Sequence, residues 1–205
     1  MTKQSVSIAI AGYGGTGVIT TGQLLLKASA KAGYFGLAQR SFGPQIRGGE
    51  SLSLLRFSNQ PVLSPDDTFD LLILLDTDHV TRFSAEVPLD HNSVVIIAKN
   101  QAKTPNFVEV SGAKVVALPF DLVASETSDG GENIVATGFI AHLLGFEKSL
   151  IQQVLRSHFV KKESLLAQSE TWLLSGWELA KKHKDINVIT LAQPSENSPR
   201  WLVNG

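Results

Sequence analysis

The sequence predicts an α/β fold, a doubly wound and mostly parallel sheet with a C-terminal helical cap. Two observations predict it. In the first 120 residues, short apolar runs flanked by Asp, Asn, Gly or Pro have the length of strands, and the first of them is followed by a segment with helical periodicity. After Phe120, apolar residues recur at helical spacing only. Strands that alternate with helices and are followed by helices favour a sheet covered by helices.

The first predicted unit is a strand, a tight loop and a helix. The run from Val6 to Ala11 is apolar and ends in glycines, which predicts a buried strand. The helix that follows is expected to end before Gly33, because glycine is common just after a helix C-terminus. Its periodic positions are Val18, Ile19, Gly22, Leu25, Leu26 and Ser29.

Three further runs predict interior strands of a parallel sheet: Leu71 to Leu75, Val94 to Ala98 and Val115 to Leu118. Each is apolar throughout, so we expect each strand to be buried on both faces. The run from Ser51 to Phe57 instead alternates apolar with partly polar residues. This pattern predicts a half-buried strand that is antiparallel or lies at an edge of the sheet.

Three helices are expected to close the domain. The segment from Ile134 to Leu144 is apolar nearly all round and needs cover on every side. Trp172 and Trp177 lie five residues apart on the last helix and face different directions, so we expect one in the core and the other against a partner chain. Both features predict association, either with a second copy or with other subunits. The apolar stripes of the two later helices are Leu150, Ile151, Val154, Leu155 and Phe159, and Leu165, Trp172, Leu173, Gly176 and Leu179.

The 205 residues, 43% of them hydrophobic, suffice for one sizeable core, which makes a single domain the default. We place this domain at residues 1–185 and an extended C-terminal tail or linker at residues 186–205. Turn-forming residues from Gln193 to Pro199 separate a strand-like run, Val188 to Leu191, from the apolar Trp201 to Val203. A free terminus is seldom so apolar, so we expect that the chain was cut from, or evolved from, a longer one.

Charge and composition exclude several partners and chemistries. The 18 basic and 19 acidic residues balance, and no basic cluster exceeds Lys181, Lys182 and Lys184, so we expect no nucleic-acid and no membrane partner. No apolar run approaches the ~20 residues of a membrane-spanning helix, and no signal peptide is evident, which predicts a cytoplasmic protein. Without cysteine, the chain cannot form disulfides, thiolate zinc sites, Cys-ligated iron–sulfur clusters or a cysteine nucleophile.

A glycine motif follows the first predicted strand. The sequence Gly12-Tyr13-Gly14-Gly15-Thr16-Gly17 satisfies G-x-G-x-x-G between a strand and a helix, which makes the predicted fold Rossmann-like. Backbone N–H groups and a positive helix end can face a phosphate or another anion there. In the alternative interpretation, which the sequence leaves open, the glycines only allow a tight turn and close packing. The candidate anion-binding residues are Gly12, Gly14, Gly15, Thr16 and Gly17.

Other candidate ligand sites have simpler explanations. The acidic residue that would hold a nicotinamide ribose about 20 residues past the loop is missing, although Arg40 could meet a 2′-phosphate. Asp76 and Asp78 could hold Mg²⁺ or Mn²⁺ in a sugar-nucleotide transferase, but capping of the next helix is the favoured role. We expect no metal, because the histidines show no paired spacing. They are His79, His91, His142, His158 and His183.

A second motif reads Ser41-Phe42-Gly43-Pro44-Gln45-Ile46-Arg47-Gly48-Gly49-Glu50. We expect residues 45–50 to form an exposed loop at the ligand edge of the sheet. Arg47 is the most suggestive side chain, because a planar guanidinium on a glycine-rich segment suits a carboxylate or a phosphate. The alternative is a salt bridge from Arg47 to an acidic residue of its own domain.

Together the two motifs resemble the gamma subunit, or the fused gamma domain, of the 2-oxoacid:ferredoxin (acceptor) oxidoreductases. The resemblance continues in the segments from Asp70 to Asp76 and from Asn133 to Gly138, so it spans most of residues 6–145. It implies an accessory part of an enzyme that converts a 2-oxoacid and CoA to acyl-CoA and CO₂, with thiamine diphosphate and iron–sulfur clusters.

In that family, the thiamine and the clusters belong mainly to other subunits or domains. The resemblance therefore implies no cofactor and no catalytic residue on this chain, which would form a structural element and an active-site wall and would be inactive alone. The implied partners are alpha and beta subunits or domains, a ferredoxin-like delta subunit where one exists, and ferredoxin as acceptor. The implied residues on the substrate or CoA side are Gln45, Arg47, Gly48 and Gly49. The alternative function is a stand-alone nucleotide-binding module, regulatory or NAD(P)-dependent.

Overall fold

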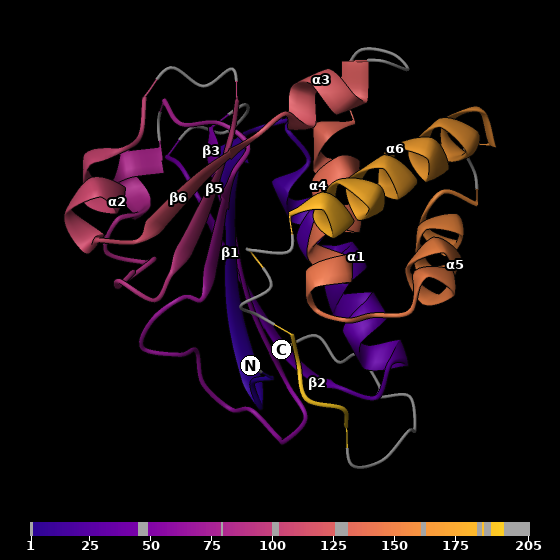
Figure 1. Cartoon of the computed structure of the whole chain (residues 1–205), viewed down its shortest axis with the longest axis horizontal. Coiled ribbons are helices and arrows are strands. Elements are labelled where there is room, and N and C mark those ends of the chain that lie inside the picture. The colour runs from indigo at the N-terminus through magenta and orange to yellow at the C-terminus, as the bar shows by residue number, and fades with distance from the viewer. Residues whose placement is uncertain are drawn as a thin grey trace.

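The computed structural model describes residues 2–44, 49–78, 80–99, 103–125, 131–160, 163–183, 186 and 190–194. Within these ranges the chain forms one six-stranded sheet with helices on both faces (Figure 1). The strands and helices expected from the sequence up to residue 182 are all present, so the α/β fold class is confirmed. In chain order the elements are β1 (Ser5–Tyr13), α1 (Val18–Lys31), β2 (Phe35–Phe42), β3 (Glu50–Ser58), β4 (Leu71–Leu74), η1 (Val80–Phe83), β5 (Val94–Ala98), α2 (Asn106–Ser111), β6 (Lys114–Leu118), α3 (Phe120–Ser125), α4 (Glu132–Leu143), α5 (Lys148–His158) and α6 (Glu163–Lys182).

The strand order of the sheet is β2-β3-β1-β4-β5-β6. β1, β4, β5 and β6 run parallel, whereas β3 runs antiparallel to both of its neighbours, β1 and β2. The sheet is therefore mostly parallel, as predicted. The antiparallel direction expected for residues 51–57 is confirmed, but this strand lies inside the sheet and not at its edge.

Both edge strands differ from the sequence prediction. β2 is not predicted, because most of its residues are exposed and the strand shows neither an apolar run nor a clean alternation. The prediction of β6 as an interior strand is wrong, since it forms the opposite edge and its Val115 is 39% exposed. A short apolar run does not encode how many neighbours a strand has, so it cannot by itself separate central strands from edge strands.

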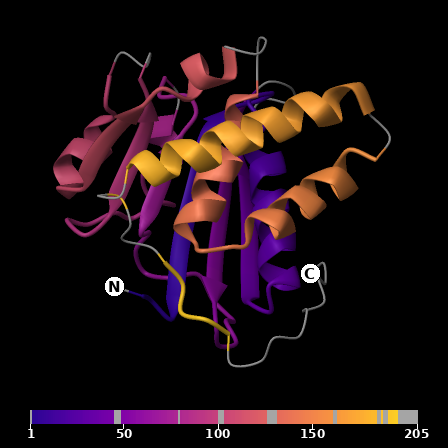
Figure 2. The same ribbon diagram turned by 45° about the vertical axis from the view of Figure 1, so that its right-hand side comes forward.

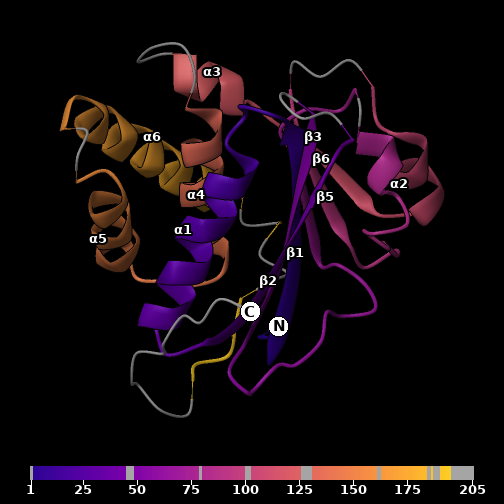
Figure 3. The same ribbon diagram turned by 180° about the vertical axis from the view of Figure 1, so that it is seen from behind.

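Helices cover the two faces of the sheet unequally (Figures 1 and 3). α1, α4, α5 and α6 lie on one face, so the helices expected as a cap form a layer against the sheet. η1 and α2 lie on the other face. Side chains of β1 alternate between two cores, with Ile8 and Ile10 toward the α1 face and Ala9 and Ala11 toward the η1 face.

Three short helices were not expected from the sequence. η1 has four residues, and α2 and α3 have six each, so none of them completes enough turns to show a period. From the strand-like run at residues 188–191, the structure describes Thr190 and Leu191, and Leu191 forms an isolated parallel bridge with Lys3. No helix in the described part of the chain is long and apolar enough to span a membrane.

α6 lies directly against α4 (Figure 2), and two glycines in reciprocal positions allow the contact. A Cβ atom on Gly138 of α4 would lie 2.0 Å from the Leu173 carbonyl oxygen of α6. A Cβ atom on Gly176 of α6 would lie 1.9 Å from the Val135 carbonyl oxygen of α4. Because a backbone carbonyl cannot turn aside as a side chain can, both positions require glycine.

The prediction of one tryptophan at a partner surface is wrong, because Trp172 and Trp177 are each only 7% exposed. Trp172 Nε1 donates a hydrogen bond of 3.0 Å to the Ala124 carbonyl of α3, and the Trp177 ring packs 4.9 Å from the His142 ring of α4. Side chains five residues apart point about 140° apart around a helix. Both tryptophan side chains still lie in the core, because α3 and α4 flank α6 on different sides. All apolar residues of α4 are also buried. Neither helix therefore gives a reason for association.

The reciprocal glycine contact predicts that Gly176→Ala destabilises the chain. The added methyl group would push α4 and α6 apart, and we expect a loss of about 2 kcal/mol or more in the free energy of unfolding. For a chain of this size, Tm falls by roughly 4–8 °C in thermal unfolding followed by circular dichroism. Thr171→Ala, at an exposed position of the same helix, is the control. Equal Tm values for Gly176→Ala and the wild type would contradict the close backbone contact.

Candidate functional site

The topology marks one crevice at the carboxyl edge of the sheet. α1, which follows β1, lies on one face, and η1, which follows β4, lies on the other, while β1 and β4 are neighbours. The connection therefore changes face between these two strands. Open α/β sheets bind ligands at such a switch point. Here residues 14–17 follow β1, and residues 75–78 follow β4, at this edge of the sheet.

The glycine loop is a tight turn built on Tyr13. The Tyr13 carbonyl accepts hydrogen bonds from the backbone N–H of Thr16 at 3.1 Å and from the Thr16 hydroxyl at 2.6 Å. Gly15 and Gly17 have φ values of 99° and 78°, a conformation that side chains other than glycine rarely adopt. The turn then delivers the chain into the first turn of α1, with Gly17 as its N-cap.

Packing accounts for two of the glycines without a ligand. A Cβ atom on Gly12 would lie 2.7 Å from the Thr16 hydroxyl and 3.3 Å from the Leu75 Cβ, and one on Gly17 would lie 2.3 Å from the Asn133 side-chain amide. A Cβ atom on Gly15 would meet no atom within 4 Å, so backbone conformation alone explains glycine there. The packing interpretation that the sequence left open is thus sufficient at these positions, and it does not conflict with an anion at the same loop.

Two helix N-termini meet at this edge. α1 begins after Gly17 and α4 begins after Gly131; both N-caps are left-handed, and neither supplies a side-chain cap to its helix. The Asn133 carbonyl joins the two helices, because it accepts hydrogen bonds from the hydroxyls of Thr21, at 3.0 Å, and Thr137, at 2.7 Å. The free N–H groups of both helix starts carry partial positive charge. Asn133 was not among the candidate residues, although it begins a segment that the sequence singled out.

Acidic side chains lie close to the same edge. Burial raises the pKa of the Glu132 carboxyl, and the negative charge of Asp121 raises it further. Asp121 Oδ1 is itself buried without a hydrogen-bond partner. Asp76 is engaged locally, since its carboxylate accepts a hydrogen bond of 2.9 Å from the backbone N–H of Asp78. The role favoured for this segment was capping of the next helix, whereas the structure shows a local turn that precedes η1, which begins at Val80.

Most of the second motif lies outside the described residues, which include neither Gln45, Arg47 nor Gly48. The structure corrects one residue of the loop expected at residues 45–50, because Glu50 is the first residue of β3. The backbone N–H of Gly43 donates a hydrogen bond of 2.7 Å to the Glu50 carbonyl and closes the base of the connection. Because Glu50 pairs with Tyr13, this connection leaves the sheet beside the glycine loop, as expected for a loop at the ligand edge.

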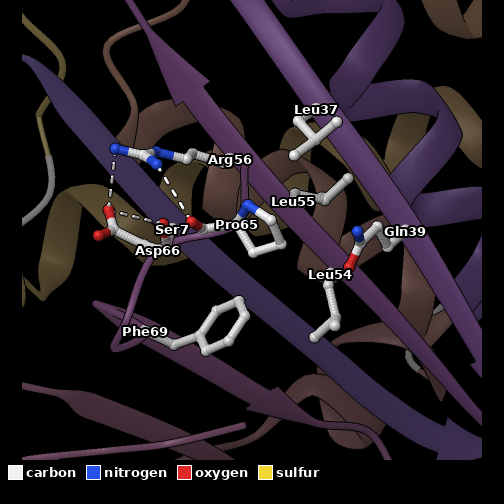
Figure 4. A pocket seen from close by; sticks show the side chains of 9 residues that line it. All are labelled: Ser7, Leu37, Gln39, Leu54, Leu55, Arg56, Pro65, Asp66 and Phe69. Atoms are coloured by element: carbon white, nitrogen blue, oxygen red, sulfur yellow. Dashed lines mark hydrogen bonds and ion pairs between the residues drawn. The ribbon is translucent and has the colours of Figure 1, made fainter. Parts of the chain in front are cut away.

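A small hollow lies elsewhere, on the face of β3 under Arg56 (Figure 4). The Arg56 guanidinium lies 3.4 Å from the Asp66 carboxylate, and Ser7, Leu54 and Phe69 are among the other residues that line the hollow. Its free volume of about 10 Å³ has room for one water molecule. Since Ser7 lies in the amino half of β1, the hollow is remote from the switch point, and it is too small for a substrate.

Comparison with known proteins gives a consistent result. Residues 7–178 match the family model described as pyruvate ferredoxin/flavodoxin oxidoreductase. The 2-oxoglutarate synthase subunit KorC of Methanocaldococcus jannaschii is 27% identical over 190 residues, which are 88% of this chain and 96% of that protein. The ketoisovalerate oxidoreductase subunit VorA of Methanothermobacter marburgensis is 25% identical over 184 residues, but these cover 88% of this chain and only 37% of that protein.

Two solved structures have the same fold. The 2-oxoglutarate:ferredoxin oxidoreductase from Magnetococcus marinus, solved with 2-oxoglutarate, coenzyme A and succinyl-CoA bound, superposes with a TM-score of 0.82 at 25% identity. The match covers 95% of this chain and 34% of that one, so the chain spans about a third of that protein. The keto/oxoacid ferredoxin oxidoreductase gamma subunit from Geobacter sulfurreducens gives a TM-score of 0.67 at 23% identity, over 86% of this chain and 99% of that one.

The packing at the glycine loop predicts different costs for two substitutions to alanine. Gly15→Ala and Gly17→Ala both place a side chain at positive φ, which costs about 1 kcal/mol. Only Gly17→Ala also collides with Asn133, so we expect it to cost about 2 kcal/mol more in the free energy of unfolding. Urea denaturation of both variants measures the difference. Equal losses would mean that α1 and α4 do not meet as described.

Proposed function

The chain belongs to the pyruvate ferredoxin/flavodoxin oxidoreductase family, and on this premise we propose that it is the accessory gamma component of a thiamine diphosphate-dependent 2-oxoacid:ferredoxin oxidoreductase. The assembled enzyme converts a 2-oxoacid and CoA to acyl-CoA and CO₂ and passes two electrons to an acceptor. The observation that carries the proposal is the family match over residues 7–178, which includes both sequence motifs.

The composition of the chain bears on where the iron–sulfur clusters of such an enzyme are held. It contains no cysteine, so it offers no thiolate for an iron–sulfur cluster. The described residues include no group of three His, Asp or Glu side chains that could hold a metal ion. We therefore assign thiamine diphosphate and the clusters to the partner subunits or domains, and to this chain a structural role as a wall of the active site.

The partners in this proposal are the alpha and beta subunits or domains, a ferredoxin-like delta component where one exists, and ferredoxin as the cytoplasmic acceptor. Relatives of two different lengths support this proposal. The unit corresponds to nearly the whole of the KorC subunit and of a solved gamma subunit, and to about a third of the longer VorA and Magnetococcus chains. The same fold thus occurs as a separate chain and as part of a longer one.

In this proposal, two segments at the carboxyl edge of the sheet lie on the side where the 2-oxoacid and CoA bind. The glycine loop, with Gly12, Gly14, Gly15, Thr16 and Gly17, offers backbone N–H groups to an anion. The β2–β3 connection, with Gln45, Arg47, Gly48 and Gly49, contributes the substrate or CoA side, where the Arg47 guanidinium suits a carboxylate or phosphate. A stand-alone nucleotide-binding module is not favoured, because the family model over residues 7–178 and the KorC relative are both those of oxidoreductase components.

The proposed function predicts that the isolated chain folds yet shows no oxoacid oxidation. Benzyl viologen reduction is measured with pyruvate, 2-oxoglutarate and 2-ketoisovalerate, each with CoA and thiamine diphosphate. Anaerobic co-expression with the alpha and beta partners should restore turnover and co-purify the three components. Turnover by the chain alone, or full activity of the partners without it, would overturn the proposal.

The proposed role of Arg47 on the substrate side predicts a loss of activity on its substitution. Arg47→Lys keeps the positive charge but loses the planar fork, so in the assembled enzyme it should lower kcat/KM by a factor that corresponds to roughly 1–3 kcal/mol. The Tm of this chain should not change. Arg156→Lys, the same substitution at a side chain that is 61% exposed on α5, is the control. An assembled enzyme indifferent to both Arg47→Lys and Arg47→Ala would exclude Arg47 from the substrate side.

A further inference from the structure

Three segments of the carboxyl edge meet at one residue, Glu50. As the first residue of β3, it pairs with Tyr13, the residue whose carbonyl anchors the glycine loop. Its own carbonyl accepts the backbone hydrogen bond from Gly43 that closes the β2–β3 connection. Its carboxylate faces η1, where Arg82 Nη1 lies 4.0 Å from Glu50 Oε2. Glu50 is therefore placed between the glycine loop, the β2–β3 connection and η1.

The Glu50 carboxylate is unusual in its surroundings. The side chain is only 14% exposed, and among the residues that the structure describes, the buried Oε2 has no hydrogen-bond partner. The distance of 4.0 Å to Arg82 is an ion pair but is too long for a hydrogen bond. A buried acceptor without a donor destabilises a fold, and a neutral residue would avoid that cost. Stability of this chain does not explain a carboxylate at this position.

The neighbours of Glu50 fit its side chain closely. Gly43 has no Cβ atom, and one built there would lie 1.9 Å from Glu50 Oε2, so the carboxylate lies across the end of β2 in the space that glycine leaves. On the other side, the Arg82 guanidinium carbon lies 5.1 Å from the centre of the Phe83 ring, which is fully buried. This cation–π contact fixes the guanidinium next to the carboxylate.

We propose that Glu50 is a positioning residue: its carboxylate, which lies between Gly43 and Arg82 of η1, holds the end of β2 against η1 and beside the glycine loop. The inference rests on the proposed function, in which this connection faces the 2-oxoacid or CoA. Glu50 does not touch the substrate. It fixes the backbone from which the connection is presented, so its loss weakens substrate binding without removing a reacting group.

The test uses two substitutions that disturb the carboxylate differently, in enzyme assembled from this chain and its partners. Glu50→Gln keeps the shape and removes the charge. Gly43→Ala keeps the charge but displaces the carboxylate, because a flexible side-chain end can yield to the new methyl group. The oxoacid used is the one that the wild type oxidises fastest among pyruvate, 2-oxoglutarate and 2-ketoisovalerate. Both variants should raise the KM for this oxoacid or for CoA about 10-fold, while kcat stays within about twofold of the wild-type value.

Further measurements separate positioning from a purely structural role. Glu50→Gln should leave Tm unchanged or raise it, because it removes a buried charge that lacks a hydrogen-bond donor. Hydrogen exchange is measured on the full chain without partners. The Gly43 amide should exchange about 10-fold faster in Glu50→Gln than in the wild type, while the amides of β1 keep their protection. In a Glu50→Ala background, Gly43→Ala should add nothing to KM, since no carboxylate is left to displace. Glu86→Gln, at an exposed position just after η1, is the matched control.

The outcomes distinguish this inference from the function on which it rests. If the wild-type chain fails to restore activity to its partners, the proposed function is wrong. If it restores activity but Glu50→Gln and Gly43→Ala leave KM unchanged, Glu50 has no positioning role. A fall in kcat that parallels a fall in Tm would also overturn the inference, because it would mark Glu50 as an element of stability alone.

Discussion

The close approach of α4 to its neighbours is the contact on which the rest of the structure depends. Glycine permits it at four places: Gly17 beneath Asn133, Gly131 beneath the Trp172 ring, Gly138 against Leu173 and Gly176 against Val135. α4 thereby joins α1 to α6 on one face of the sheet. An apolar helix with no polar face can stay within a single chain only because these small residues let other elements enclose it.

This packing also determines the geometry of the carboxyl edge. Since α4 is fixed against Gly17, its first turn stands beside the first turn of α1, and two sets of backbone donors point to one crevice. The opposite rim is built differently, from the β2–β3 connection and η1, which Glu50 and Arg82 link. The two rims are thus held by different contacts. The first depends on the close approach of Asn133 to Gly17, and the second on the backbone hydrogen bond from Gly43 to Glu50 together with the ion pair of Glu50 and Arg82.

Sequence patterns predicted the elements that local physics determines. β1, β4 and β5 were predicted because each is a short apolar run, interrupted in β1 only by Ser7. α4 was predicted from a longer apolar run, and α6 from a helical period that extends over several turns. β2 was missed because an edge strand with exposed residues on both faces carries no pattern. The glycine motif located the switch point, but the role of Asn133 could not be predicted, since its contact with Gly17 joins residues more than 100 positions apart. Glu50 was not predicted as a candidate, because the sequence does not show whether a carboxylate is buried or exposed to solvent.

The central position of β1 has a consequence for the synthesis of the chain. Along the chain, β1 precedes both of its partners in the sheet, since β3 and β4 end 45 and 61 residues after Tyr13, at Ser58 and Leu74. At about 5–20 residues per second, β3 is complete roughly 2–9 s after β1 and β4 roughly 3–12 s after it, and only α1 and β2 are complete before β3. The nascent chain therefore carries β1, whose interior residues are all buried in the fold, without its strand partners for several seconds, and protection by a chaperone would act in this interval.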